Sequence, residues 1–481
     1  MIDSKSLTML SDFYEFTMAG GYFNSPVRDT IGYYDMYFRT VPDKGGYVIA
    51  CGLESVVDYL SNLRFTDEDI DYLREKKIFS EEFLSYLKNF KFECDVWAVP
   101  EGTPMFPNEP LVTVRGPVIQ AQLLETMILL CMNHQTLIAT KASRIVRAAQ
   151  GRPVMEFGAR RAQGYSAAIL GARATYIAGC SSTSCTISDR DYHIPVAGTM
   201  AHSWVQMFPT EYDAFVSYAK SYPDSCTLLI DTYSVLKSGL PNAIKCFNEV
   251  LAPMGYRPKG VRIDSGDVTY LTNKIRKALD EAGYPDCKIV VSNSLDEYII
   301  QDLIAQGAKI DSFGVGERLI TSRSEPVLGG VYKLTAVEDA CGNIIPKIKL
   351  SENVAKITTP CFKQVYRLYS RETDQAFADM VTLHNETIDD SGDITIFDPE
   401  FTWKKKTVSN FYARPLMVQI FKKGELVYKL PDIEELRRYC LEQMNTIWEE
   451  VKRFENPHKY YVDLSKELWN IKQKLLDEYS N

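Results

Sequence analysis

The sequence has no excess of basic residues, since its 481 residues include 54 Lys and Arg against 63 Asp and Glu. The net charge of −9 argues against a general nucleic-acid or membrane-surface binder, so any anionic ligand must be met by local basic groups. An apolar run long enough to span a bilayer and the pattern of a signal peptide are also lacking. We therefore expect a cytoplasmic protein with no nucleic-acid or membrane partner.

Paired cysteines are lacking as well. The eleven cysteines include no C-x-x-C pair, so neither a zinc ribbon nor a disulfide framework is indicated, and no residue is assigned as a metal ligand. We expect most of them to be buried, reduced thiols. The 45% of hydrophobic and 24% of charged residues are typical of a folded protein large enough for two or three cores.

The pattern of apolar and polar residues changes twice along the chain, which predicts three domains. Residues 1–130 mix helical and strand-like segments and are expected to form an α+β domain. A strongly apolar helical stretch over residues 118–142 connects it to a middle domain, residues 131–350. Residues 351–481 are expected to form a small C-terminal domain.

The middle domain contains short apolar runs of β type, at residues 227–231, 260–264, 288–293 and 309–314. Helical patterns separate the last three runs, and one of them extends over residues 268–283 with Gly283 as its end. Strand, helix and strand at this spacing indicate parallel strands joined by crossover helices. The sequence therefore predicts a barrel-like α/β sheet.

Polar residues or glycine end each of these runs, namely Asp231, Asp264, Asn293 and Gly314. In barrel enzymes the carboxyl ends of the strands build the active site. Residues of these types also end strands merely to begin a turn, so both interpretations stay open for any one of them. Four such ends in succession favour a functional site.

The stretch "VRIDSGD" combines a cation with a carboxylate. Arg262 and Asp264 flank Ile263, so strand alternation places both side chains on one face. Arg262 could bind a carboxylate or a phosphate through paired hydrogen bonds, while Asp264 could hold ribose hydroxyls or a magnesium ion. The alternative is a structural ion pair inside the sheet.

The stretch "SFGVGERLITS" places Gly314 and Gly316 just past a strand, with Thr321 shortly after. Glycine lets the backbone approach an anion with its N–H groups, although a plain turn is an alternative. The third glycine of a dinucleotide fingerprint and the Gly-Lys-Ser/Thr of a nucleoside-triphosphate loop are both missing. A cradle for a single phosphate group remains.

A third cluster, "MEFGARRAQG", offers an aromatic face at Phe157 and charge at Arg160 and Arg161. This pairing suits a flat ring that lies near an anion. Solvated arginines at the start of an amphipathic helix are the alternative.

One of only five histidines, His202, follows small neutral residues in "PVAGTMAHSW". A lone histidine is commonly a packed structural residue. The second interpretation is that its ring is kept accessible because a ligand must reach it.

Taken in order, "DFYEFTMAGGYF", "EFGARRAQG", "GTMAHSW", "LLIDTYS", "RIDSGD", "FGVGERLITS" with "GGVYKL", and "NPHKYYVDLS" resemble the motifs of nicotinate phosphoribosyltransferases. The resemblance extends from about residue 12 to residue 464. It implies a type II phosphoribosyltransferase fold, with an N-terminal α+β domain, an irregular, incomplete α/β barrel and a small C-terminal domain. It also implies homodimers with shared active sites.

The resemblance implies formation of nicotinate mononucleotide and pyrophosphate from nicotinate and phosphoribosyl pyrophosphate, in NAD biosynthesis. The resemblance also implies ATP as a cosubstrate, whose hydrolysis is coupled to the reaction, as in a ligase, through a phosphohistidine at His202. Mg²⁺ is expected to bind together with the pyrophosphate and ATP. The motif positions further imply that Tyr14, from the second subunit, and Phe157 cover the pyridine ring. The other implied roles are nicotinate contacts at Thr199 and Arg262, phosphoribosyl pyrophosphate or phosphate contacts at Arg160, Gly314, Gly316 and Thr321, and a catalytic role near the ribose or metal at Asp264.

Two positions depart from the family pattern. Cys185 stands where asparagine is usual, and Glu317 with Arg318 replaces small polar residues. A carboxylate beside a phosphate is unfavourable, so we expect Glu317 to point away or to pair with Arg318. Two alternatives to the main assignment are a nicotinamide phosphoribosyltransferase and a non-catalytic metabolite-binding protein of the same fold.

Overall fold

The computed structural model describes residues 7–353 and 356–480 and divides the chain into two compact units. The first unit comprises Met1–Leu137 and Val327–Asn481, so both ends of the chain contribute to it, and the second comprises Ile138–Pro326. The apolar stretch of residues 118–142 forms α5 (Val118–Gln122) and most of α6 (Glu125–Ala148). No helix within the described ranges combines the length and apolar character needed to cross a membrane.

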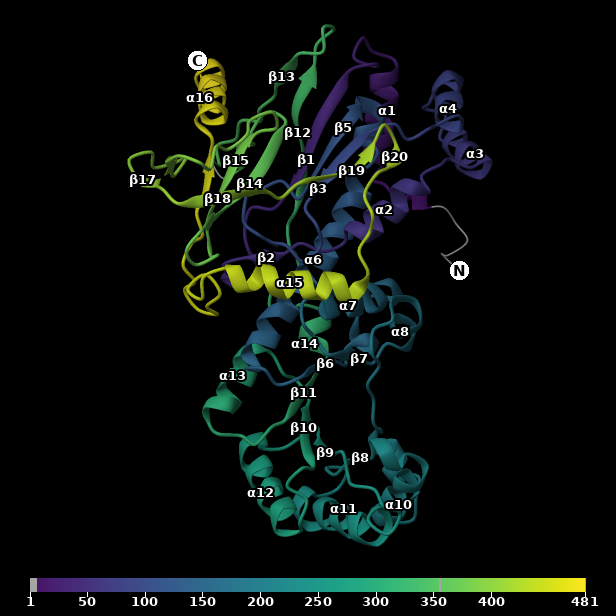
Figure 1. Ribbon diagram of the computed structural model, residues 1–481. Helices are drawn as coiled ribbons and strands as arrows, with labels where there is room; N and C mark the ends of the chain where they lie inside the picture. The colour runs from purple at the N-terminus through teal and green to yellow at the C-terminus, as the bar shows by residue number, and fades with distance from the viewer. Residues whose placement is uncertain (1–6, 354–355, 481) are drawn as a thin grey trace. The chain divides into compact units, whose positions relative to one another are not determined.

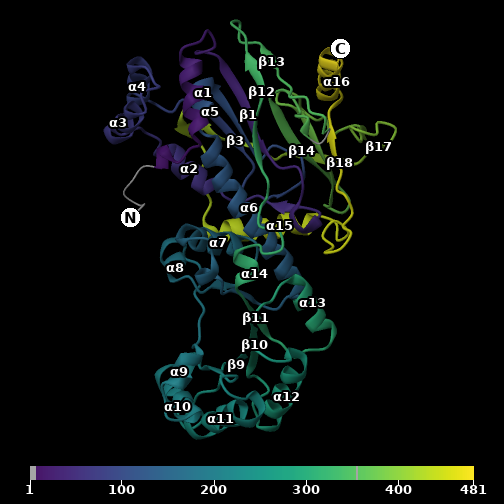
Figure 2. The same ribbon diagram turned by 180° about the vertical axis from the view of Figure 1, so that it is seen from behind.

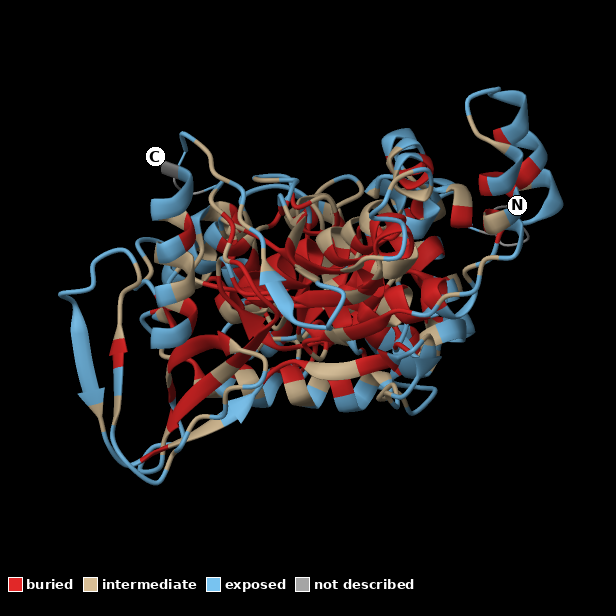
Figure 3. Ribbon diagram, turned by 90° about the horizontal axis from the view of Figure 1, so that it is seen from above, coloured by how far each residue is buried: buried red, intermediate tan, exposed pale blue. Residues whose placement is uncertain are grey.

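The first unit is built on two larger sheets. The seven-stranded sheet is antiparallel, in the order β13 (Ile344–Pro346), β12 (Val331–Glu338), β1 (Ile31–Tyr37), β5 (Val112–Pro117), β3 (Asp95–Ala98), β19 (Val418–Lys422) and β20 (Glu425–Leu426). The four-stranded sheet has the order β18 (Phe411–Pro415), β14 (Lys363–Ser370), β15 (Ala376–Leu383) and β21 (Val462–Leu464). Figure 3 shows buried positions gathered on the strands, whereas the outward faces of the helices are exposed.

The remaining elements of the first unit are short pairs of strands and helices. The pairs are β2 (Val48–Ile49) with β4 (Pro104–Met105) and β16 (Ile394–Phe397) with β17 (Lys405–Val408). The helices are α1 (Phe13–Phe23), α2 (Leu53–Ser61), α3 (Asp67–Glu75), α4 (Glu81–Lys88), α15 (Ile433–Thr446) and α16 (Lys466–Ser480).

Helix α1 carries a carboxylate into the core of the first unit. Glu15 is fully buried, and its Oε1 accepts hydrogen bonds from the backbone N–H and hydroxyl of Thr126, at 3.1 and 2.5 Å. Its second oxygen is buried without a hydrogen-bond partner among the described residues. Burial, assisted by the nearby charge of Glu125, raises the pKa of Glu15 to about 7. The folded protein therefore favours the protonated form below about pH 7.

This buried carboxyl group predicts a pH-dependent contribution to stability. Because the folded-state pKa lies above the unfolded value, the contribution is complete below about pH 4.5 and is lost as the pH rises through about 7. We compare the free energy of unfolding of Glu15→Gln with that of the native protein at pH 5 and at pH 8. The difference between the two proteins should shift in favour of the variant by roughly 2–3 kcal/mol from the lower to the higher pH. Urea denaturation at both pH values measures this difference. A difference that does not change with pH would contradict the assignment.

The second unit contains one six-stranded parallel sheet. Its order is β7 (Ser182–Thr183), β6 (Val154–Glu156), β11 (Ser312–Val315), β10 (Lys288–Ser292), β9 (Gly260–Ile263) and β8 (Thr227–Leu229). The four strands predicted from the apolar runs are thus confirmed as β8 to β11, and the α/β class with them. In Figures 1 and 2 this sheet lies between helices α10 to α12 and helices α7, α8 and α14 of the same unit.

The predicted barrel is not confirmed, because the sheet is open. Its edge strands β7 and β8 are two and three residues long and share no backbone ladder in the part of the chain that the structure describes. Six short strands cannot provide the eight staggered strands with which α/β barrels usually close. The parallel order and the crossover helices are as predicted. A separate small C-terminal domain is likewise not confirmed, because residues 327–481 belong to the same unit as residues 1–137.

Helices connect the parallel strands, namely α7 (Tyr165–Ile177), α8 (Thr186–Tyr192), α9 (His202–Gln206), α10 (Glu211–Ser221), α11 (Leu240–Cys246), α12 (Val268–Glu281) and α13 (Glu297–Ala305). A further helix, α14 (Glu317–Ile320), follows β11, the last of these strands in the chain. Helix α12 shows why they form. Asp267 caps it by accepting a hydrogen bond from the Tyr270 backbone N–H, and Ile275 and Leu279 are buried one turn apart. Gly283 follows the helix with φ of 84°, a conformation that favours glycine.

All eleven cysteines are free, and ten of them are buried. The expectation of buried, reduced thiols is confirmed. Cys341 is the exposed exception.

Candidate active site

The predicted polar strand ends meet at the carboxyl edge of the parallel sheet in the second unit. The register pairs Arg262 of β9 with Val290 of β10, and Ser292 at the end of β10 with Gly314 of β11. Parallel strands bring their carboxyl ends to the same edge, which is where open α/β sheets bind ligands. This edge is the candidate active site.

Arg262 is fixed by several partners at this edge. Its Nε donates to the Ser292 hydroxyl at 2.9 Å, and an Nη donates to the Thr199 hydroxyl at 3.0 Å. The same nitrogen reaches the Met200 carbonyl at 3.4 Å, and the other Nη lies 3.6 Å from Asp264 Oδ1. The guanidinium is therefore held in one orientation, which suits recognition of a planar carboxylate.

Ser292 joins Arg262 to Asp264. Its hydroxyl donates to Asp264 Oδ1 at 2.6 Å while accepting from Arg262 Nε. The apolar run had predicted the next residue, Asn293, as the strand end that faces the site. The structure shows that Asn293 forms a turn, with φ of 98° and its side-chain oxygen accepting from the Ser294 backbone N–H.

Asp264 and Asp231 occupy different positions at the strand ends. Asp231 accepts hydrogen bonds from the Asp264 backbone N–H at 2.8 Å and the Ser265 hydroxyl at 2.7 Å, which ties β8 to β9. Asp264 keeps Oδ2 directed toward His202 Nε2, 3.9 Å away. About a third of the Asp264 side chain is exposed, so the carboxylate is partly open to solvent.

His202 begins helix α9, and 41% of its side chain is exposed. Its Nδ1 lies 3.1 Å from the Thr232 hydroxyl, and its Nε2 faces Asp264. A hydroxyl partner at Nδ1 orients the ring and presents Nε2 outward. The ring is therefore partly exposed, and Thr232, which lies within the "LLIDTYS" motif, is its hydrogen-bond partner.

Phe157 explains the glycine at position 314. A Cβ on Gly314 would lie 2.6 Å from the Phe157 ring, so only glycine leaves room for the ring over the sheet edge. The Arg262 guanidinium lies 5.8 Å from the centre of the same ring. The aromatic face and the guanidinium thus lie close together at the sheet edge, a combination that suits a flat acid.

The remaining phosphate candidates lie beyond β6 and β11. Arg160 is exposed in the turn after β6, and Gly316 precedes α14. Thr321 ends α14 and donates its hydroxyl to the Glu317 carbonyl at 2.7 Å. Thr321 also lines a cavity of about 470 Å³.

Of the two expectations for Glu317, that it points away or that it pairs with Arg318, the pair with Arg318 is wrong. Glu317 lies 3.1 Å from an Nη of Arg323 and 3.9 Å from Nε of Arg161. Arg318 is instead paired with Asp296, which also caps α13. No motif in the sequence had indicated a role for Asp296.

Tyr14 belongs to the first unit, whereas the other predicted site residues belong to the second. It lies on α1 with 44% of its surface exposed. Burial of part of the ring, together with the charge of Glu125, raises the pKa of its hydroxyl well above the usual value. The neutral phenol is thus the form present at physiological pH.

Cys185 is buried at the start of α8, and its backbone N–H donates to the Thr183 hydroxyl at 3.0 Å. Its side chain offers no replacement for the polar contact of an asparagine.

The described residues contain no cluster of three or more His, Cys, Asp or Glu side chains suited to hold a metal ion. Magnesium commonly binds through one or two carboxylates together with substrate phosphates and water. The partly exposed carboxylate of Asp264 fits that mode of binding, in which the substrate supplies most of the ligands.

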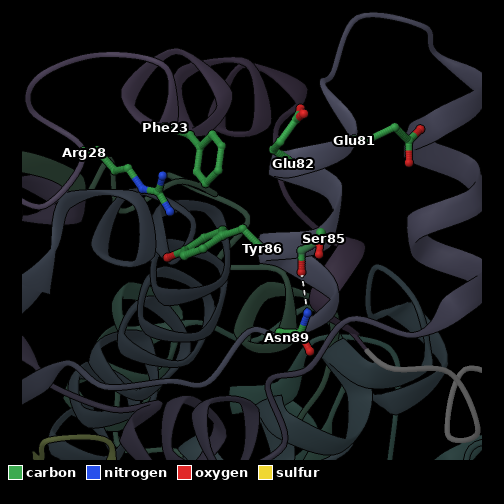
Figure 4. Close-up of a pocket in the computed structure, with 7 residues that line it drawn as sticks. All are labelled: Phe23, Arg28, Glu81, Glu82, Ser85, Tyr86 and Asn89. Atoms are coloured by element: carbon green, nitrogen blue, oxygen red, sulfur yellow. Dashed lines mark hydrogen bonds between the residues drawn. The ribbon is translucent and has the colours of Figure 1, made fainter.

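A second cavity, of about 610 Å³, lies in the first unit between the end of α1 and α4 (Figure 4). The one cation among its described lining residues, Arg28, is stacked on Phe23 at 3.9 Å, and Glu81 and Glu82 contribute negative charge. This lining differs from the sheet edge, where an arginine, hydroxyls and a carboxylate converge.

A parallel α/β sheet whose carboxyl edge presents a fixed arginine, an aromatic face, a carboxylate and an accessible histidine defines an α/β enzyme that binds a flat anionic substrate. Family models match over most of the chain. They are the nicotinate phosphoribosyltransferase N-terminal domain over residues 9–133, the nicotinate phosphoribosyltransferase family over 153–357, and the C-terminal domain over 362–472.

Individual relatives agree with these matches. A curated nicotinate phosphoribosyltransferase of Bacillus subtilis is 41% identical over 473 residues, which are 98% of this chain and 96% of the relative. The crystal structure of human nicotinic acid phosphoribosyltransferase has a TM-score of 0.84 and 29% identity, covering 97% of this chain and all of the other. A nicotinate-nucleotide pyrophosphorylase structure from Pyrococcus furiosus, with a TM-score of 0.70 and 24% identity over 92% of this chain and 96% of the other, shares the fold.

The chain belongs to the nicotinate phosphoribosyltransferase family. The family and the transferase class that the sequence motifs predicted are confirmed.

Proposed function

We propose that the protein forms nicotinate mononucleotide and pyrophosphate from nicotinate and phosphoribosyl pyrophosphate, as a step of NAD biosynthesis in the cytoplasm. The observation that carries this proposal is the orientation of Arg262, whose guanidinium lies between the Thr199 and Ser292 hydroxyls and beside the Phe157 ring. This arrangement matches a pyridine ring with a carboxylate. Family membership supports the same reaction.

In this reaction the pyridine nitrogen attacks the anomeric carbon while the bond to pyrophosphate breaks. Arg262 and Thr199 bind the nicotinate carboxylate, and Phe157 stacks on the ring and aligns its nitrogen. The sugar becomes cation-like in the transition state, and the Asp264 carboxylate stabilises that charge from the sheet edge. Asp264 would hold Mg²⁺, which would neutralise charge on the leaving pyrophosphate.

The residues that follow β6 and β11 are assigned to binding of the phosphate group of phosphoribosyl pyrophosphate. Arg160, Gly316 and Thr321 contact phosphate oxygens, with Gly314 keeping the strand end open beneath Phe157. By resemblance to the family, the protein acts as a homodimer in which Tyr14 of the second copy covers the pyridine ring.

We further propose that ATP is a cosubstrate and that His202 is its phosphoryl acceptor. Nε2 attacks the γ-phosphorus, the bond to ADP breaks, and a phosphohistidine forms. Thr232 at Nδ1 fixes the ring so that Nε2 is the accessible nitrogen. Phosphorylation of Nε2, which lies 3.9 Å from Asp264 Oδ2, adds negative charge to the site and so couples ATP hydrolysis to product formation.

The test is mononucleotide formation by the purified protein with nicotinate or nicotinamide, with and without ATP. We expect turnover of nicotinate that ATP stimulates, and we expect His202→Ala to lose roughly tenfold or more of that stimulation. Labelled γ-phosphate should appear on the native protein as an acid-labile adduct and should be absent from the variant. His458→Ala, which removes an exposed imidazole of the other unit, is the matched control.

Preference for nicotinamide would overturn the substrate assignment, and absence of turnover with either base would overturn the enzymatic one. If His202→Ala kept the full stimulation by ATP, the phosphohistidine would be excluded.

A further inference from the structure

A cavity of about 470 Å³ opens beside the proposed phosphoribosyl site. It is lined by Arg161, Gln163, Glu317, Thr321, Arg323 and Pro326, all of which belong to the second unit. These residues follow β6 and β11, which are neighbours in the sheet, so the cavity lies at the same carboxyl edge as Arg262.

The charges around this cavity do not cancel. Arg161 and Arg323 share a single carboxylate, that of Glu317. The nearby Arg318 is neutralised by Asp296. Two lining cations therefore face one lining anion in a protein whose net charge is −9.

The ion pairs that Glu317 forms contribute little binding energy. The side chains of Arg161 and Arg323 are 65% and 60% exposed, and Glu317 is 41% exposed, so solvent screens their attraction. A multivalent anion with several oxygens could pair with both guanidinium groups at once and would compete well with one carboxylate. The Gln163 amide and the Thr321 hydroxyl, both lining the cavity, add neutral hydrogen-bonding groups.

We propose that this cavity binds a phosphate or pyrophosphate group through Arg161 and Arg323, and that Glu317 is an internal carboxylate that competes with the anion and lowers its affinity. The identity of the physiological ligand, a phosphate group of phosphoribosyl pyrophosphate or ATP, rests on the proposed function. The capacity to bind the inorganic anion does not.

The experiment is titration calorimetry of the full chain with inorganic pyrophosphate. We expect Glu317→Gln to bind pyrophosphate about 3- to 10-fold more tightly and Arg323→Gln to bind it about 10-fold more weakly. Arg161→Gln serves as a second loss variant should Arg323→Gln fail to fold. Glu281→Gln and Arg257→Gln make the same charge changes at exposed ion pairs elsewhere in the unit and should stay within about twofold of the native protein.

Unchanged or weaker binding by Glu317→Gln would overturn the competing role of the carboxylate. Unchanged binding by both arginine variants would overturn the site. The native protein could turn over neither nicotinate nor nicotinamide while Glu317→Gln binds pyrophosphate more tightly and Arg323→Gln more weakly than the native protein. That result would overturn the proposed reaction and support the anion site. If the native protein turns over nicotinate while all variants bind pyrophosphate equally, the reaction stands and the anion site is excluded.

Discussion

Replacement of Arg262 by glutamine is expected to lower kcat/KM for nicotinate by about 10²- to 10³-fold. The substrate carboxylate would lose its charged, paired hydrogen bonds, and the Thr199 hydroxyl would lose the group that orients it. The loss should fall mainly on KM for nicotinate, because phosphoribosyl pyrophosphate is bound by residues beyond β6 and β11. Initial rates measured over both substrate concentrations separate the two effects.

Arg262→Lys is the matched variant, since it keeps the charge but loses the planar fork. We expect it to recover part of the lost activity. Far-ultraviolet circular dichroism and thermal unfolding check that both variants are folded. An increase in KM for phosphoribosyl pyrophosphate, with KM for nicotinate unchanged, would contradict the assignment of Arg262 to the carboxylate.

Asp264→Asn is expected to lower kcat by about 10²- to 10³-fold. Asparagine retains an oxygen that can accept the Ser292 hydrogen bond, so the strand end should keep its shape while the negative charge is lost. The cation-like sugar and Mg²⁺ would then lack their carboxylate partner. Turnover at saturating substrate and as a function of Mg²⁺ concentration measures both consequences.

Asp267→Asn provides a close control. Asp267 lies three residues further on and caps α12, a role that asparagine fills equally well, so the same charge change should have little effect. A kcat for Asp264→Asn within about threefold of the native value would exclude a charge-based role in catalysis.

Much of the site could be predicted because the periodicity of a strand indicates which face of the sheet each side chain lies on, as well as the type of secondary structure. The alternation through Arg262 and Asp264 placed both on one face, and the apolar runs located four of the six strands. Polar residues directly after such runs could be expected to converge, since parallel strands end at one edge. His202 required the family resemblance, because nothing in its spacing separates an accessible ring from a packed one.

Other features depend on contacts between distant segments, which local patterns do not encode. The hydroxyls of Ser292 and Thr232 reach partners about 30 residues away in the chain. The partners of Glu317 and Arg318 follow from the turn geometry of α14 and from Asp296 on another loop. Closure of a barrel likewise depends on strand length and stagger, which short apolar runs leave undefined.

The single hydroxyl of Ser292 has a consequence for how this enzyme could change its substrate. It touches the group that recognises the base and the group that serves the reacting carbon, so neither can be altered without disturbing the other. An attempt to redesign selectivity toward an uncharged base by substituting Arg262 alone would therefore sacrifice turnover in the same step. Selection for a new base should instead recover compensating changes at position 292, and a library that varies positions 262 and 292 together should outperform one that varies either alone.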